Sequence, residues 1–104
     1  MDKYTIKFSK KSKFDMVKII NYIGNELKQP ELSEEYFNLF MTEINELNML
    51  PKRNPTVKGK APSGTERRKL LIKNYVVLYL IDELNNMVYI ERIVYGASNW
   101  IKEL

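Results

Sequence analysis

The side chains of this protein that could do chemistry are basic, phenolic or carboxylic, because the sequence has no histidine and no cysteine. Their absence excludes thiol nucleophiles, disulfides, Cys–His zinc sites and histidine acid–base catalysis. It also excludes a Ser–His–Asp triad. Any catalysis at neutral pH must therefore use Lys, Arg, Tyr, Asp or Glu, assisted by backbone groups.

The basic side chains are concentrated in one central stretch of the sequence. Residues 51–75 carry eight bases and one acid, a net charge of +7, whereas residues 29–50 carry five acids and no base. The eight bases are Lys52, Arg53, Lys58, Lys60, Arg67, Arg68, Lys69 and Lys73. Such a cluster predicts a basic patch for a polyanion. A solvated loop whose lysines only aid solubility explains the charge equally well.

Length and composition predict one ordinary globular domain over residues 1–104. The chain is 44% hydrophobic and 29% charged, as in typical soluble domains. No apolar run approaches the ~20 residues of a membrane span, and residues 1–13 are polar and unlike a signal peptide. We therefore expect a cytosolic, cytoplasmic protein without a membrane partner. No glycine-rich phosphate loop and no ligand cluster is present, so neither a metal nor a cofactor is expected.

The first half of the sequence predicts one strand and two helices. Tyr4, Ile6 and Phe8 alternate with polar residues, as in a half-buried strand. A helix is predicted over about residues 13–27, after a cap at Ser9 or Ser12. Its apolar stripe comprises Met16, Ile19, Ile20, Ile23 and Leu27.

A second helix is predicted after a cap at Ser33 and ends at Pro51. Its buried stripe comprises Phe37, Phe40, Ile44 and Leu47. Because the joint at Gln29-Pro30 is short, the two helices should form an antiparallel hairpin.

The second half of the sequence predicts a loop and three strands. Residues 51–65 hold three of the four prolines and two of the four glycines, which favours a long loop. Strands are expected at about 66–73, 75–81 and 87–95, with tight turns that favour an antiparallel meander. The tail 97–104 should form a short helical turn. The predicted fold is α+β, in the order β-α-α-β-β-β, with the helical hairpin on one face of a mostly antiparallel twisted sheet.

Several segments, in this order, resemble the RelE/ParE superfamily of toxins from bacterial type II toxin–antitoxin modules. They are Tyr4–Ser9, Phe14–Ile23, Leu47–Pro51, Arg68–Tyr79 followed by Ile81–Glu83, and Val88–Gly96. The resemblance covers nearly the whole chain. It implies a compact α+β fold, a cognate antitoxin as partner and a toxin–antitoxin hetero-oligomer.

The resemblance also implies a target, because some members cleave messenger RNA in the ribosomal A site and others poison DNA gyrase. In the RNA-cleaving members, basic residues bind phosphates, orient the ribose 2′-hydroxyl and stabilise developing charge, which requires no histidine. The residues implied as catalytic are Arg68, Arg92 and Tyr95. The residues implied as nucleic-acid-binding are Lys52, Arg53, Lys58, Lys60, Arg67 and Lys69.

Each candidate catalytic residue also has a structural interpretation. Arg68 could instead pair with a glutamate of the second helix. Arg92 could form an ion pair with Glu91 or Glu46 as a fold element, because an unpaired charge is rarely buried. Tyr95 could be an aromatic residue that covers the core at the end of a strand.

Two further features bear on the site. Strand alternation places Arg67 and Lys69 on the face opposite Arg68 or at the edge of the sheet, so Arg67 and Arg68 cannot both face one groove. The resemblance implies Arg-Asp where this chain has Ser98 and Asn99. If that arginine takes part in catalysis or target contact, three alternatives follow: a weak toxin, a toxin that uses Arg92 instead, or a protein that has lost toxicity.

These observations lead to three hypotheses. The first is an endoribonuclease (mRNA interferase) that depends on the ribosome and mRNA and so inhibits translation. The second is a non-enzymatic inhibitor of DNA gyrase that binds a protein–DNA complex. The third is a binding-only relative that keeps antitoxin binding and operator regulation.

Overall fold

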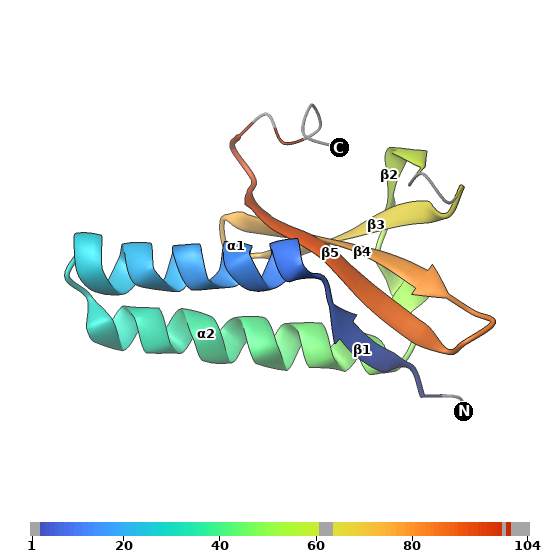
Figure 1. Ribbon diagram of the computed structural model, residues 1–104, viewed down its shortest axis with the longest axis horizontal. Helices are drawn as coiled ribbons and strands as arrows, with labels where there is room; N and C mark the ends of the chain where they lie inside the picture. The colour runs from blue at the N-terminus through green and yellow to red at the C-terminus, as the bar shows by residue number, and fades with distance from the viewer. Residues whose placement is uncertain (1–2, 61–63, 99, 101–104) are drawn as a thin grey trace.

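The computed structural model describes residues 3–60, 64–98 and 100, with only the backbone given for residues 59 and 60. Two helices run side by side, and the strands form one twisted sheet (Figure 1). The elements in chain order are β1 (Thr5–Phe8), α1 (Lys10–Asn21), α2 (Pro30–Asn45), β2 (Thr56–Lys60), β3 (Glu66–Ile72), β4 (Tyr75–Asp82) and β5 (Met87–Tyr95). In the described part of the chain, no helix has the length and apolar character needed to cross a membrane.

The sheet confirms the predicted α+β class but has one strand more than predicted. Its order is β1-β5-β4-β3-β2, with β1 parallel to β5 and the other pairs antiparallel. The additional strand, β2, lies in the segment predicted as a loop over residues 51–65, so that prediction is wrong for residues 56–60. The prolines and glycines of this segment are typical of a loop. Pro55, however, lies just before the strand, so it does not prevent Thr56 and Val57 from pairing with β3.

Helix α1 begins earlier than predicted because Ser9, and not Ser12, is its cap. The Ser9 Oγ accepts a hydrogen bond from the Ser12 backbone N–H at 2.9 Å, so the helix starts at Lys10. The helix widens into a π-helical turn at Tyr22–Glu26. Leu27 lies beyond this turn and is 47% exposed, so it does not extend the buried stripe.

Helix α2 begins at Pro30, which corrects the prediction that Ser33 caps it. Proline suits the first helical position, where no intrahelical partner exists for an N–H. Ser33 is instead buried, and its hydroxyl donates a hydrogen bond of 2.9 Å to the carbonyl oxygen of Ile20 in α1. Gly24 allows this close approach, because a Cβ there would lie 3.2 Å from the Ser33 Oγ. Ser33 therefore ties the two helices together.

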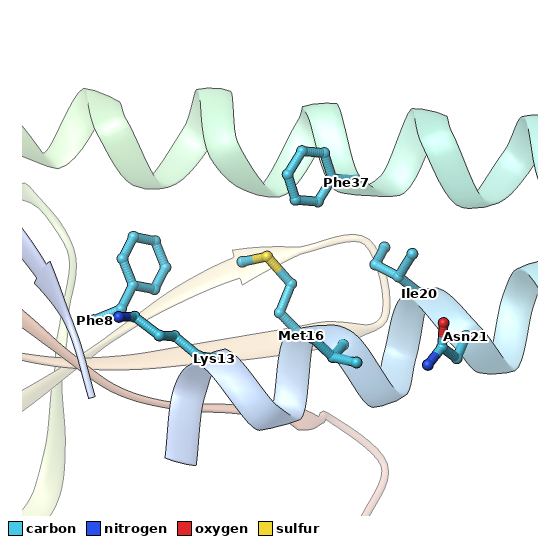
Figure 2. Close-up of a pocket in the computed structure, with 7 residues that line it drawn as sticks. Phe8, Lys13, Met16, Ile20, Asn21 and Phe37 are labelled. Atoms are coloured by element: carbon cyan, nitrogen blue, oxygen red, sulfur yellow. The ribbon is translucent and has the colours of Figure 1, made fainter. Parts of the chain in front are cut away.

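The main core lies between the helical hairpin and the sheet. Its buried members are Met16, Phe40, Ile44, Leu47, Leu70, Ile72, Val77, Tyr79, Val88, Ile90 and Ile93. Phe37, predicted to be buried with Phe40, is 43% exposed. Phe37 lies on the side of α2 that faces α1, at the outer surface of the hairpin (Figure 2).

The opposite face of the sheet has a smaller core. Val76, Leu78 and Val94 are buried there together with Trp100, and Val57 packs against them. Strand β4 contributes to both cores, so it is a central strand covered on both faces. Trp100 therefore covers the sheet face that the helices leave open; the rest of the predicted tail helix, 99 and 101–104, lies outside the described residues.

A bulge in β5 shifts the side chains of the last strand. Tyr79 pairs with Ile90 and Leu78 pairs with Arg92, so Glu91 is an additional residue in the ladder. Ile90 and Ile93, three positions apart, consequently both belong to the main core. The bulge also decides where Glu91 and Arg92 lie.

Candidate functional site

Arg68 occupies the middle of β3 and holds the preceding turn against the sheet. It pairs with Thr56 of β2 and with Tyr79 of β4. Its Nη1 donates to two backbone carbonyl oxygens, that of Asn54 at 2.7 Å and that of Lys52 at 3.1 Å. The predicted structural alternative, an ion pair with a glutamate of α2, is not what the structure shows. Arg68 binds the backbone of residues 52–54 instead.

Two further polar side chains fix the same turn. The hydroxyl of the buried Tyr79 donates to the carbonyl oxygen of Pro51 at 2.6 Å and accepts from the Asn54 side-chain amide at 3.1 Å. Burial raises the pKa of Tyr79, since a phenolate would have to lose its hydration. Leu50 precedes the turn with a φ of 51°, a left-handed conformation that side chains rarely adopt. The turn is therefore strained at Leu50 and held by Arg68, Asn54 and Tyr79.

Arg67 points away from this turn and forms an internal ion pair. Its Nε lies 2.6 Å from the Glu91 Oε1, and its Nη2 lies 3.1 Å from the Oε2. Arg67 is only 5% exposed, and the hydrogen bond to Glu91 raises the pKa of Arg67. This geometry does not favour the prediction that Arg67 binds nucleic acid. The side chain is almost fully buried, and its Nε and Nη2 already donate to Glu91.

Arg92 is paired with an acid that sequence reasoning did not consider. Its Nε and Nη2 donate to the two carboxylate oxygens of Asp15 at 2.8 and 3.1 Å. The Asp15 Oδ2 also accepts the backbone N–H of Ile93 at 2.9 Å. The proposed partners were Glu91 and Glu46, and the structure corrects both, because the bulge turns Glu91 toward Arg67. Asp15 thus binds helix α1 to the β5 segment that continues past the end of β1.

Tyr95 ends β5 beside aromatic residues of the core. Its ring lies 5.7 Å from that of Tyr75, which in turn lies 5.7 Å from Phe40, both in edge-to-face geometry. Tyr95 is half exposed at 50%. Ser98, where the resemblance implied an arginine, donates a hydrogen bond from its hydroxyl to the Tyr95 carbonyl oxygen at 2.6 Å, whereas Asn99 lies outside the described residues. The arrangement agrees with the interpretation of Tyr95 as a core-covering aromatic.

The remaining candidate cations lie at separate places on the β2–β3 side of the sheet. Lys52 forms an exposed ion pair with Glu83, and the hydrogen bond in this pair raises the pKa of Lys52. The Arg53 guanidinium lies 3.9 Å from the Glu46 carboxylate. Lys58 is exposed and Lys69 is half-buried, whereas the side chain of Lys60 is outside the described part of the chain.

These positions do not bring Arg68, Arg92 and Tyr95 into one site. Arg68 faces the turn at one end of the sheet, while Arg92 reaches helix α1 beside β5. All four arginines of the chain contact an acceptor within the protein. Arg68 is engaged through its Nη1 alone and the Arg53 side chain is 44% exposed, so a phosphodiester-cleaving centre on these residues stays a prediction, with Arg67 and Arg92 held in internal ion pairs.

Asp15, Asn54 and Glu91 are the important polar residues that the sequence did not reveal. Asp15 carries a weak signal, since it is the single acid in a helix otherwise rich in lysine. The partner of each residue is far away in the sequence: 77 positions separate Asp15 from Arg92, and 24 separate Glu91 from Arg67.

An apolar groove lies between α1 and α2 on the outer side of the helical hairpin. Figure 2 shows Met16 and Ile20 projecting from α1 toward Phe37 on α2, with Phe8 and the Lys13 side chain at one end of the groove. The groove has a volume of about 330 Å³. Val17 also lines it and is 56% exposed. Because exposed apolar side chains meet here in a concave surface, the groove has the character of a protein-binding site.

The sequence matches the family described as ParE toxin of type II toxin-antitoxin system, parDE, over residues 6–100. A sequence comparison with curated proteins finds no match. Several solved structures share the fold at low sequence identity. One is the chromosomal ParDE toxin–antitoxin system from P. aeruginosa, with a TM-score of 0.71 and 15% identity over 88% of this chain and 95% of that one.

Two structures of other toxin–antitoxin complexes are also similar. The RelBE2 complex from Mycobacterium tuberculosis has a TM-score of 0.62 and 19% identity over 94% of this chain and 97% of that one. The archaeal RelE-RelB complex from Pyrococcus horikoshii OT3 has a TM-score of 0.60 and 13% identity over 91% and 97% of the two chains. At these identities, the similarity establishes the fold.

Proposed function

Because the chain belongs to the ParE toxin family of type II toxin–antitoxin systems, we propose that it arrests growth by inhibiting DNA gyrase in the cytoplasm. It does so by binding and not by cutting RNA. In the cell, a cognate antitoxin binds the toxin in a hetero-oligomer and suppresses this activity.

The observation that favours gyrase over RNA as the target is that the arginine side chains are bound to acceptors within the protein. A ribonuclease without histidine needs cations that are free to meet the scissile phosphate and the developing charge. Here the Arg68 Nη1 donates to two carbonyl oxygens of the protein, Arg67 is buried against Glu91, and Arg92 is paired with Asp15. Breaking the Arg67 and Arg92 pairs to admit a phosphate would leave the largely buried carboxylates of Glu91 and Asp15 without their partners.

The proposal is tested by comparing the two targets directly. Purified toxin should inhibit supercoiling of relaxed plasmid by gyrase and leave gyrase-linked breaks in the DNA. After induction in cells, primer extension on a reporter transcript should find it intact, together with an SOS response. Codon-register cuts in the transcript, with normal supercoiling, would instead establish the endoribonuclease. Growth without either effect would identify a binding-only relative.

The variant Arg68→Ala separates the two mechanisms further. If Arg68 has only a structural role, the folded fraction of this variant inhibits gyrase at the same concentration as the parent protein. An RNA-cleaving centre on Arg68 would lose at least about 100-fold in rate, the usual effect of removing a group that stabilises transition-state charge. The folded fraction is measured by circular dichroism, so that lost stability is not mistaken for lost activity.

For the antitoxin, the best-supported contact is the apolar groove between α1 and α2. An amphipathic antitoxin helix can place its apolar face against Val17, Ile20 and Phe37. The positively charged Lys13 at the rim favours an acidic partner. Phe37→Ala should weaken antitoxin binding at least tenfold in calorimetric titration and leave gyrase inhibition intact. Leu84→Ala, at the 96% exposed Leu84 in the β4–β5 turn, is the matched control. Unchanged affinity in Phe37→Ala would place the antitoxin elsewhere.

A further inference from the structure

A second charged surface lies on helix α1, away from the groove between the helices. It is a shallow hollow of about 470 Å³. We call it the basic α1 surface, and its lining residues are Lys10, Lys11, Phe14, Asp15, Lys18 and Arg92. None of its three lysines belongs to the central basic stretch of the sequence.

The acid in this surface does not neutralise the lysines. Both carboxylate oxygens of Asp15 accept hydrogen bonds from Arg92, and one of them also accepts the Ile93 N–H. The four bases against one acid leave a net charge of +3 in the lining. Since the Asp15 charge is matched by Arg92, the positive potential comes from Lys10, Lys11 and Lys18.

The placement of the lysines is not explained by helix stability. Lys10 and Lys11 occupy the first turn of α1, where the helix dipole disfavours positive charge, and no acid lies in that turn. This arrangement is unfavourable for the isolated domain and is relieved when an anion approaches the surface.

An aromatic ring stands among these cations. Phe14 is 64% exposed, so its ring belongs to neither core. The Lys18 ammonium lies 5.6 Å from the centre of the ring. A basic surface that tracks phosphates, combined with an exposed aromatic ring on which a base can stack, is the arrangement by which proteins bind unpaired nucleic-acid strands. An acidic polypeptide would match the charge but would have no base to place on the ring.

We propose that the basic α1 surface binds a single-stranded segment of nucleic acid, with Lys10, Lys11 and Lys18 on successive phosphates and Phe14 stacked on a base. The proposal goes beyond gyrase inhibition and does not require it. Gyrase inhibition without strand binding would remove only this inference, and strand binding without gyrase inhibition would remove only the proposed target.

The test uses the full-length toxin and fluorescently labelled strands of about 12 nucleotides, a length within the site sizes of single-strand-binding domains. Three probes of equal length are compared by fluorescence anisotropy over a range of salt: a DNA strand, an RNA strand of the same sequence and an abasic DNA strand. Parent toxin should bind the DNA or the RNA strand in a strongly salt-dependent manner, and the tighter of the two identifies the natural class. A salt-independent interaction would overturn the proposal.

Two variants distinguish the roles of charge and stacking. The triple variant Lys10→Gln, Lys11→Gln, Lys18→Gln should make the slope of log K against log salt shallower by about 2, at roughly 0.7 per lost phosphate contact. The control Lys3→Gln, Lys28→Gln, Lys73→Gln removes the same charge at three exposed positions elsewhere. Equal effects of the two triple variants would show that net charge alone attracts the strand, and the site would be wrong.

Phe14→Ala should weaken binding of the ordinary strand about 5- to 100-fold, the range for losing one stacked base, without changing the salt slope. It should not weaken binding of the abasic strand, whereas Leu84→Ala should affect neither. Two outcomes would overturn the stacking role: equal losses on both strands, or poly-glutamate binding as tight as the strand and insensitive to Phe14→Ala. The second would mark an acidic-polypeptide site.

Discussion

Arg67 and Glu91 form a two-point ion pair across the central strand of the sheet, with contacts of 2.6 and 3.1 Å between β3 and β5. Strand β4 lies between them, and the bulge at Glu91 brings its carboxylate to the guanidinium. Neither charge is substantially exposed, with side-chain exposures of 7% for Arg67 and 19% for Glu91. The pair therefore acts as a clamp over three strands.

Removing one member of this pair should be more damaging than removing both. Arg67→Met leaves the Glu91 carboxylate buried without its partner, and we expect a loss of about 3 kcal/mol in the free energy of unfolding. The double variant Arg67→Met, Glu91→Leu should recover most of that loss, because apolar replacements can substitute for a buried ion pair. Urea denaturation measures all three proteins. A double variant less stable than the single one would contradict this account.

Asp15 should be a principal link between α1 and the sheet. Asp15→Ala removes the acceptor of both Arg92 and the Ile93 N–H, and we expect a loss of about 3 kcal/mol. Asp15→Asn keeps one oxygen for the N–H and should be about 1 kcal/mol less damaging. The exposed Lys13→Gln on the same helix is the control. Equal stability of the Ala and Asn variants in urea would show that the hydrogen bond to Ile93 contributes little.

The two neighbouring phenylalanines of α2 should differ strongly in their importance for stability. Phe40 is fully buried against Tyr75, whereas Phe37 is 43% exposed at the groove. Phe40→Ala should lower the free energy of unfolding by about 3–5 kcal/mol, the usual effect of emptying an aromatic core site. Phe37→Ala should lower it by less than about 1 kcal/mol, since much of its surface is already in water. Similar losses in thermal or urea unfolding would mean that Phe37 is buried in solution.

Alkaline pH should destabilise the protein through the buried Tyr79 and the partly buried Tyr75. Burial raises the pKa of Tyr75 and of Tyr79 above the ordinary value of 10.0. The folded state therefore retains these protons when the unfolded chain has lost them, so their stabilising contribution is complete below pH ~10 and falls above it. The slope is at most about 1.4 kcal/mol per pH unit for each group.

Tyr79→Phe tests this pH dependence. The variant should lose one such contribution and unfold with a shallower pH dependence above pH ~10. At neutral pH it should be less stable by about 1–3 kcal/mol, because the Pro51 carbonyl oxygen loses its buried donor. Urea unfolding at several pH values measures both effects, and Tyr89→Phe, at an exposed tyrosine, is the control. An unchanged alkaline slope in Tyr79→Phe would contradict the assignment.

The helical hairpin and the last three strands could be predicted because their apolar residues repeat with clear periods. Strand β2 could not, because a five-residue edge strand is stabilised by pairing with β3 and not by its own pattern. The prolines that flank this strand in the sequence also favour the prediction of a loop. The start of α2 was missed for a related reason: Ser33 has the residue type of a cap, but its hydroxyl is used between helices.

The candidate site could be predicted only as a list of charges. The sequence identifies Arg67, Arg68 and Arg92 as candidates but does not show which acceptors they bind. Each acceptor belongs to a segment of the chain other than the one that carries the arginine. The bulge at Glu91 shifts the alternation within β5, so counting positions from Ile90 gives the wrong surroundings for Arg92. The basic α1 surface was overlooked because its lysines are spread over nine positions and meet only on a helix.

Strand β1 pairs in parallel with β5, from Thr5 opposite Met87 to Phe8 opposite Ile90. The first strand of the domain to be synthesised therefore has no partner until the last strand has left the exit tunnel. Until then, the helices can pack only against the sheet residues that β3 and β4 supply, and the contact between β1 and β5 forms late because of its large sequence separation. The sheet is therefore complete only when its first and last strands in the chain have met, so its final closure must follow the synthesis of β5.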